Sequence, residues 1–174
     1  MVKDSILYSP PYKKVDEMKV LVSYYSRTGH AEAMAKAVVQ GIKEEGILPL
    51  LKKIEETGID DLLEADCIII GCPTYYGSMP WEVKKLIDES IKHHGKLNGK
   101  VGGAFSTSHN VGGGNETTIL SILKAMLIHG MVIQGYSDFD HYGPVAIEKP
   151  AEEDLEKCRI MGKRITELGE KLFG

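Results

Sequence analysis

The run D-C-I-I-I-G, residues 66–71, decides the fold. Cys67 and the three isoleucines after it are apolar without a polar interruption. A run of this kind predicts a strand that is buried on both faces. Such strands lie at the centre of parallel sheets whose two faces are covered by helices.

Strand-like and helix-like segments alternate on either side of this run. Residues 29–45, for example, carry apolar side chains at the i, i+3, i+4, i+7 spacing of an amphipathic helix. By such patterns we expect strands at residues 19–25, 48–54, 66–71, 100–106 and 131–135, and helices at residues 29–45, 60–64, 81–93, 115–129 and 151–173.

This alternation predicts an α/β fold, a doubly wound parallel sheet of five strands in the order 2-1-3-4-5 with helices on both faces. Ligands of such sheets bind outside the carboxyl ends of the strands, where the strand order reverses. The loops after the first, third and fourth strands, together with the loop after the fifth, are therefore the places to look for chemistry.

The composition is that of an ordinary globular domain. The chain has 174 residues, 43% hydrophobic and 26% charged, which predicts one domain with its own core. Lys+Arg 21 and Asp+Glu 25 give a net charge of −4, which offers no basis for binding nucleic acid or an anionic membrane. No apolar run reaches the ~18 residues of a membrane span.

Other features of the composition limit the kinds of site. The three cysteines lack metal-site spacing, so we expect neither a disulfide framework nor a metal centre. Residues 1–17 contain no apolar signal-peptide core, and we assign them no role. We therefore expect a cytoplasmic protein whose domain spans residues 18–174.

The loop after the first strand combines hydroxyl side chains with a glycine at the start of a helix. A helix N-terminus offers free backbone N–H groups to an anion, and the helix dipole favours negative charge there. The loop therefore suits a phosphate group, although an ordinary N-cap also explains its hydroxyls. It matches neither the dinucleotide fingerprint nor the triphosphate P-loop. The candidate residues are Ser26, Arg27, Thr28, Gly29, His30 and Ala31.

The loop after the third strand holds aromatic side chains between prolines. They could flank a flat ring while the backbone presents N–H and C=O groups to its polar edge. The alternative is that they pack the loop onto the sheet, which we favour for Trp81 but not for Tyr75 and Tyr76. The candidate residues are Pro73, Thr74, Tyr75, Tyr76 and Gly77.

The loop after the fourth strand contains three consecutive glycines. Glycines cost backbone entropy and suit a chain that approaches something closely. Alone they would favour a flexible surface loop, but this loop shares its predicted sheet edge with the other two. His109 is either a ligand contact or a solvated histidine. The candidate residues are Ser106, Thr107, Ser108, His109, Asn110, Val111, Gly112, Gly113 and Gly114.

Four stretches, taken in order, resemble one protein family. They are Y-Y-S-R-T-G-H-A-E-A-M-A (24–35), G-C-P-T-Y-Y-G-S-M-P (71–80), F-S-T-S-H-N-V-G-G-G-N-E-T-T-I-L-S (105–121) and I-H-G-M-V-I (128–133). They look like the WrbA-type FMN-dependent NAD(P)H:quinone oxidoreductases, which are flavodoxin-like proteins. The resemblance covers about residues 18–172.

The resemblance implies a flavodoxin-like FMN site. The first loop would hold the FMN phosphate, and the second and third loops would line the isoalloxazine ring and the ribityl chain. It adds His129 and Tyr142 as flavin contacts, although the helix dipole also explains a histidine in a last helical turn. No protein side chain is expected to be catalytic, because the chemistry belongs to the flavin.

The implied reaction is two-electron reduction of a quinone or similar acceptor by NAD(P)H through FMN, with ping-pong kinetics. The family also implies a homodimer or homotetramer. The main alternative is a flavodoxin-like electron carrier that a separate reductase reduces. The stretches at residues 93–98 and 136–147 are shorter than in the family, and the shortening at 136–147 favours the carrier. A third possibility is a reductase for a nitroaromatic or a metal chelate.

Overall fold

The computed structural model describes residues 18–174, so the prediction of a separate N-terminal leader lies outside the described residues. The strands are β1 (Val20–Tyr24), β2 (Leu50–Lys53), β3 (Cys67–Pro73), β4 (Val101–Ser108), β5 (Val132–Ile133) and β6 (Val145–Ile147). The helices are α1 (His30–Glu44), α2 (Ile59–Glu64), α3 (Trp81–Glu89), α4 (Asn115–Ile128) and α5 (Glu152–Phe173), with short 3-10 helices η2 (Ile54–Glu56) and η3 (Ser90–His93).

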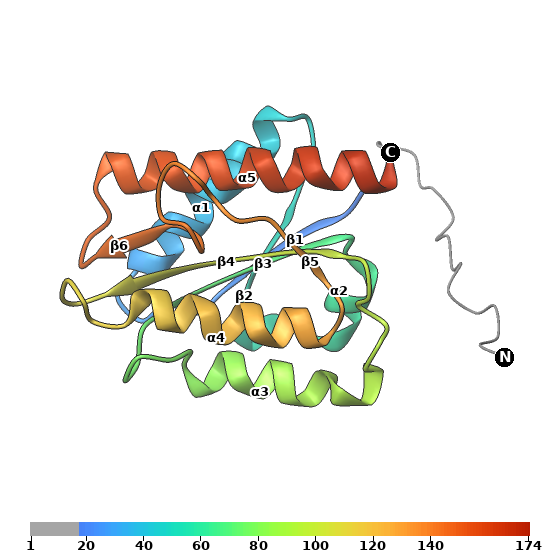
Figure 1. Cartoon of the computed structure of the whole chain (residues 1–174), viewed down its shortest axis with the longest axis horizontal. Helices are drawn as coiled ribbons and strands as arrows, with labels where there is room; N and C mark the ends of the chain where they lie inside the picture. The colour runs from blue at the N-terminus through green and yellow to red at the C-terminus, as the bar shows by residue number, and fades with distance from the viewer. Residues whose placement is uncertain (1–17) are drawn as a thin grey trace, which may run out of the picture.

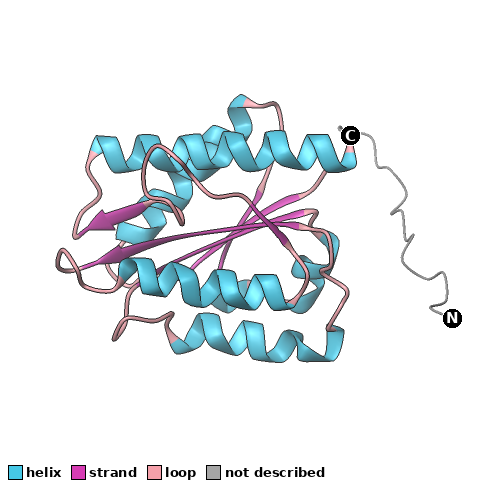
Figure 2. Ribbon diagram, viewed as in Figure 1, coloured by secondary structure: helices cyan, strands magenta, loops and turns pink. Residues whose placement is uncertain are grey.

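The strands form one parallel sheet between two layers of helices. The order β2-β1-β3-β4-β5 confirms the predicted strand order. Helices α1 and α5 cover one face, and α2, α3 and α4 cover the other (Figure 1). Figure 2 shows the same three layers coloured by type of structure.

The central strands of the sheet are buried, as the apolar run at residues 66–71 predicted. Every residue of β4 is buried, and so is every residue of β3 before Pro73. Gly71 lies opposite Phe105 in the parallel pairing of β3 and β4. A side chain at Gly71 would collide with the Phe105 ring, so the ring occupies the space that the glycine leaves. This packing holds the two central strands in register.

The last part of the sheet differs from the prediction. The strand expected at residues 131–135 is only the two-residue β5, which pairs with the start of β4, and a further strand that was not expected, β6, pairs with the end of β4. Residues 134–144 leave the sheet between them, so what we expected as a loop at 136–147 ends in a strand. Gly143, at φ 142°, passes against the Ala104 carbonyl, where a side chain would collide.

We predict that Gly71→Ala lowers the free energy of unfolding by about 1–3 kcal/mol, because a methyl group must displace the Phe105 ring from a close-packed core. Urea denaturation measures the change. The same substitution should cost less in a Phe105→Leu background, where the ring is gone.

Gly58→Ala is the matched control, because a methyl group there meets only one atom, at 3.8 Å. Its effect should stay within about 0.5 kcal/mol. Equal losses for Gly71→Ala in the two backgrounds would contradict the proposed contact with Phe105.

Candidate functional site

The loops singled out from the sequence lie at one edge of the sheet. They follow β1, β3 and β4, which are neighbours in the sheet and run parallel, so their carboxyl ends point the same way. In Figure 1 this edge is on the left. The fold therefore brings together three segments that are far apart in the sequence.

The loop after β1 leads into helix α1, whose N-terminus has no side-chain cap. Gly29, at φ 88°, is the N-cap of α1, and no side chain caps the helix. Ser26 Oγ accepts a hydrogen bond from the Gly29 N–H at 3.1 Å, which turns the loop into the helix. The first N–H groups of a helix have no partner within it. Without a side-chain cap, those of α1 remain available to an anion.

The loop after β3 is a tight hairpin. Tyr75 and Ser78 exchange two backbone hydrogen bonds of 3.1 Å. The two residues between them, Tyr76 and Gly77, both have positive φ angles, 51° and 73°. This is the geometry of a type I′ turn. The Tyr76 side chain is fully exposed at the tip of the turn, so nothing in the described chain holds it.

The glycine-rich loop after β4 is compact. Ser108 Oγ donates a hydrogen bond to the Asn110 carbonyl at 2.9 Å. A Cβ at Gly113 would lie 2.7 Å from the same carbonyl oxygen, and a Cβ at Gly114 would lie 2.7 Å from the Gly77 Cα. These approaches leave no room for side chains. Gly113 and Gly114 therefore allow close packing of backbone on backbone, whereas a Cβ at Gly112 would meet nothing within 4 Å.

Hydrogen bonds join the second loop to the third. The Thr74 N–H donates to the Thr107 carbonyl at 2.7 Å. The Thr117 hydroxyl lies 2.7 Å from the Gly77 carbonyl and 2.9 Å from the Gly114 carbonyl, both of which can accept its proton. Thr117 was not among the predicted site residues. The T-T pair of the quoted motif contained it, but only the fold shows which loop it reaches.

A second cluster joins the first loop to the second. Arg27 lies close enough to Tyr75 to raise the pKa of its guanidinium, and the rings of Tyr25 and Tyr75 meet edge to face with centroids 6.3 Å apart. Tyr25 interacts with Glu82, in the first turn of α3. Neither Tyr25 nor Glu82 was predicted, because each looks like an ordinary strand or helix residue in the sequence.

The interaction between Tyr25 and Glu82 changes the acidity of the phenol. Together with burial, it raises the pKa of Tyr25 to about 12. One carboxylate oxygen of Glu82 is buried and has no hydrogen-bond partner within residues 18–174. Tyr25 therefore keeps its proton at neutral pH, beside a carboxylate that is partly buried next to the loops.

Several predicted side chains are already engaged within the protein. Ser106 Oγ donates to the Cys72 carbonyl at 2.9 Å and lies 3.1 Å from Thr74 Oγ1. Burial raises the pKa of the Cys72 thiol, so it is not a reactive thiolate. His109 pairs with Glu148, just after β6, at 3.1 Å, and both side chains are exposed. The side chains of Ser106 and His109 thus contact other residues of the protein at this edge of the sheet.

His129 is not brought to this edge. It caps the far end of α4, and the 14 residues of the helix separate it from the glycine-rich loop by about 20 Å. Ser90 donates to the Ile87 carbonyl at 2.7 Å, so His129 Nε2, 2.8 Å from Ser90 Oγ, is the donor of that second bond. Burial and the nearby His94 lower the pKa of His129. Within one chain, its expected flavin contact cannot form.

Tyr142 lies in the segment between β5 and β6. Its side chain is 46% exposed. The next residues, Gly143 and Pro144, pass beside β4 at Ala104 and Ser106. Tyr142 therefore lies near β4, and within residues 18–174 no hydrogen bond joins it to the three loops.

Within residues 18–174, no helix is long and apolar enough to cross a membrane. The same part of the chain contains no group of three histidine, cysteine, aspartate or glutamate residues placed to hold a metal ion.

The sequence matches the model of the family described as Flavodoxin over residues 22–118, more than half of the chain. The chain belongs to the flavodoxin family. Membership implies a flavin cofactor, and the uncapped N-terminus of α1 fits its anionic end.

Relatives with different names match nearly the whole chain. A flavodoxin of Aquifex aeolicus is 37% identical over 86% of this chain and 85% of its own length. An NAD(P)H dehydrogenase (quinone) of Acidovorax ebreus is 34% identical over 90% of this chain and 98% of its own. The crystal structure of a flavodoxin, WrbA-like protein from Agrobacterium tumefaciens has a TM-score of 0.77 and 30% identity, covering 88% of this chain and 98% of that one.

We predict that Tyr25→Phe destabilises the protein by about 1–3 kcal/mol, because Glu82, which has a buried oxygen, loses its interaction with the Tyr25 hydroxyl. Urea denaturation at neutral pH measures the loss. Tyr24→Phe is the matched control on the same strand and should cost less, because the hydroxyl of Tyr24 satisfies no buried carboxylate.

The same interaction gives stability a pH dependence. The pKa of Tyr25 is about 10 in the unfolded chain and about 12 in the folded protein. The stabilisation is therefore complete below pH 10 and is lost as the pH rises through about 12. The wild type should therefore lose more stability than Tyr25→Phe across this window. Parallel losses in the two proteins would show that Tyr25 does not carry the effect.

Proposed function

We propose that the protein binds FMN at the three loops and transfers electrons from NAD(P)H to a quinone or a similar small acceptor. The observation that carries this proposal is the convergence of the loops after β1, β3 and β4 at one edge of the sheet, where hydrogen bonds join the second loop to the third. The similarity to quinone dehydrogenases over 90% of the chain supports the reaction. We also propose a cytoplasmic protein that acts as a homo-oligomer.

The chain's own residues would bind and orient the cofactor. The first N–H groups of α1 and the Ser26 hydroxyl suit a phosphate. The hairpin at Tyr76 and Gly77 and the glycine-rich loop present backbone groups and little side-chain bulk to a flat ring. When bound, FMN supplies the hydride and electron chemistry. The remaining predicted residues of these loops, with Tyr142, stay candidates for contact.

A second candidate is an electron carrier that a separate reductase reduces. The alignment with the quinone dehydrogenase of Acidovorax ebreus runs over 197 residues and covers 90% of this chain. Since 90% of 174 residues is about 157, about 40 aligned positions have no counterpart here. The alignment with a flavodoxin of Clostridium saccharobutylicum runs over 163 residues and also covers 90% of this chain, so almost every aligned position has a counterpart here. This chain has the length of a flavodoxin.

Anaerobic absorption spectra of the FMN-saturated protein, before and after addition of NAD(P)H, separate the two candidates. The enzyme should bleach directly with NAD(P)H and recover its colour with a quinone. A bound flavin that does not bleach until a reductase is added would identify the carrier. If no flavin binds, both candidates are wrong.

We predict that Ser26→Ala weakens FMN binding more than riboflavin binding, because only FMN carries the phosphate. The lost hydrogen bonds suggest a decrease of about tenfold in FMN affinity. Quenching of flavin fluorescence measures both constants. Equal losses for the two flavins would place the anion site elsewhere.

We predict that Gly113→Val lowers the affinity for both flavins alike by at least about tenfold, since the new side chain would push the loop away from the Asn110 carbonyl. Gly46→Val is the control, because Gly46 lies after α1, away from the loops, and its positive φ makes a valine at least as strained there as at Gly113. An unchanged affinity in Gly113→Val would exclude this loop as part of the ring site.

A further inference from the structure

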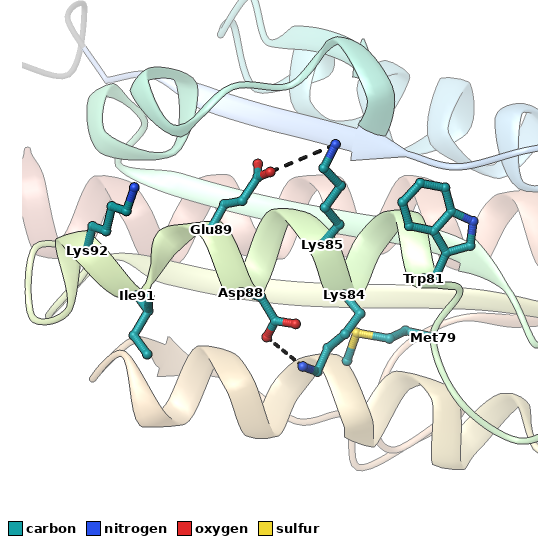
Figure 3. Close-up of a pocket in the computed structure, with 8 residues that line it drawn as sticks. All are labelled: Met79, Trp81, Lys84, Lys85, Asp88, Glu89, Ile91 and Lys92. Carbon is teal, nitrogen blue, oxygen red and sulfur yellow. Dashed lines mark hydrogen bonds and ion pairs between the residues drawn. The ribbon is translucent and has the colours of Figure 1, made fainter.

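The outer face of α3 and η3 carries apolar side chains that no other part of the described chain covers. Trp81 is 68% exposed and Ile91 is 72% exposed, at opposite ends of this face. Between them runs a shallow groove whose lining residues are drawn in Figure 3. Large apolar side chains exposed around a groove mark interaction surfaces more often than ordinary surface.

The lining residues form two rows along the helix (Figure 3). The first row reads Met79, Lys84, Asp88, Ile91: apolar, positive, negative, apolar. Lys84 and Asp88 form an ion pair of 2.5 Å within the helix, and both side chains are more than half exposed.

The second row has the same order of charge. It reads Trp81, Lys85, Glu89, Lys92: aromatic, positive, negative, positive. Lys85 and Glu89 are 3.8 Å apart, and both are also more than half exposed. The charges of the two rows nearly cancel, so the face does not select a strongly acidic or strongly basic partner.

Each row is complementary to itself when reversed. If a second copy of α3 lies antiparallel against the first, about a two-fold axis near position 86, Lys84 faces Asp88 and Lys85 faces Glu89. The ends then pair Met79 with Ile91 in one row, and Trp81 with Lys92 in the other. The first pair is apolar, and the second is a cation–π pair. A two-fold interface requires this kind of self-complementary surface.

We propose that the outer face of α3 and η3 binds the same face of a second copy of this chain, with the two helices antiparallel. The apolar ends supply the contact area, and the opposed charges fix the register, as charged pairs do at interfaces. The proposal does not depend on the flavin or on the reaction. It assigns a surface to the homo-oligomer.

Sedimentation equilibrium of the full chain gives the first test. We expect a species of twice 19.2 kDa, or a tetramer built from such pairs. A monomer at the concentrations used for the flavin assays would overturn the proposal.

Two single charge reversals test the surface. Lys84→Asp and Asp88→Lys each place like charges across the two-fold axis, and each should weaken self-association by at least about tenfold. Lys36→Asp on α1, which breaks the ion pair with Glu32 outside the groove, is the matched control and should leave association unchanged. Wild-type association in both groove variants would show that the copies meet elsewhere.

Mixing the two single variants shows whether association is weakened by like charges across the two-fold axis or by a less stable helix α3. In the mixed pair, both substituted residues face opposite charges, although each helix still lacks its internal ion pair. The mixture should therefore form a heterodimer, detected by copurification with a tag on one variant. Circular dichroism confirms that both variants are folded. Failure of folded variants to associate when mixed would overturn the proposal.

The double variant Lys84→Asp with Asp88→Lys provides an independent check. It restores opposite charges both across the axis and within the helix, and it should dimerise within a few fold of the wild type. A double variant as weakly associated as the single variants would contradict the antiparallel register.

Discussion

The contact of the Phe105 ring with Gly71 sets the register on which the functional edge depends. The ring fills the space over the glycine, and the two residues are partners in the pairing of β3 and β4. A slip of one residue would turn every side chain of the strand to the other face. With the register held, Pro73 lies opposite Thr107, and the loops beyond begin side by side. A packing contact in the core thus places two loops at the surface.

Contacts between the loops then complete the site before any ligand arrives. Thr117 reaches the Gly77 carbonyl from the first turn of α4, and Arg27 reaches Tyr75. Each contact spans two loops, so moving one loop disturbs the next. A site for a cofactor that carries its own chemistry needs this fixed geometry more than it needs reactive side chains. The low reactivity expected of Cys72 agrees with that division of roles.

Local patterns in the sequence were enough to predict most of the strands and helices. Continuous apolar runs and helical periodicity predicted the central strands, the five helices and the strand order. The three-residue β6 was missed because so short a run has no period. The pairing of Tyr25 with Glu82 was missed because it joins residues far apart in the sequence. The position of His129 at the opposite edge could not be predicted, because its motif follows the glycine-rich loop in sequence while α4 carries it away from that loop.

The division of the last strand into two pieces also affects how the protein behaves in concentrated solution. An exposed sheet edge offers unpaired N–H and C=O groups to strands of other molecules and can template aggregation. Here β5 has two residues and β6 has three, with residues 134–144 looping out between them. Neither piece is long enough to recruit a foreign strand. The opposite edge, β2, has four residues and carries Lys52 and Lys53, so charge discourages pairing there.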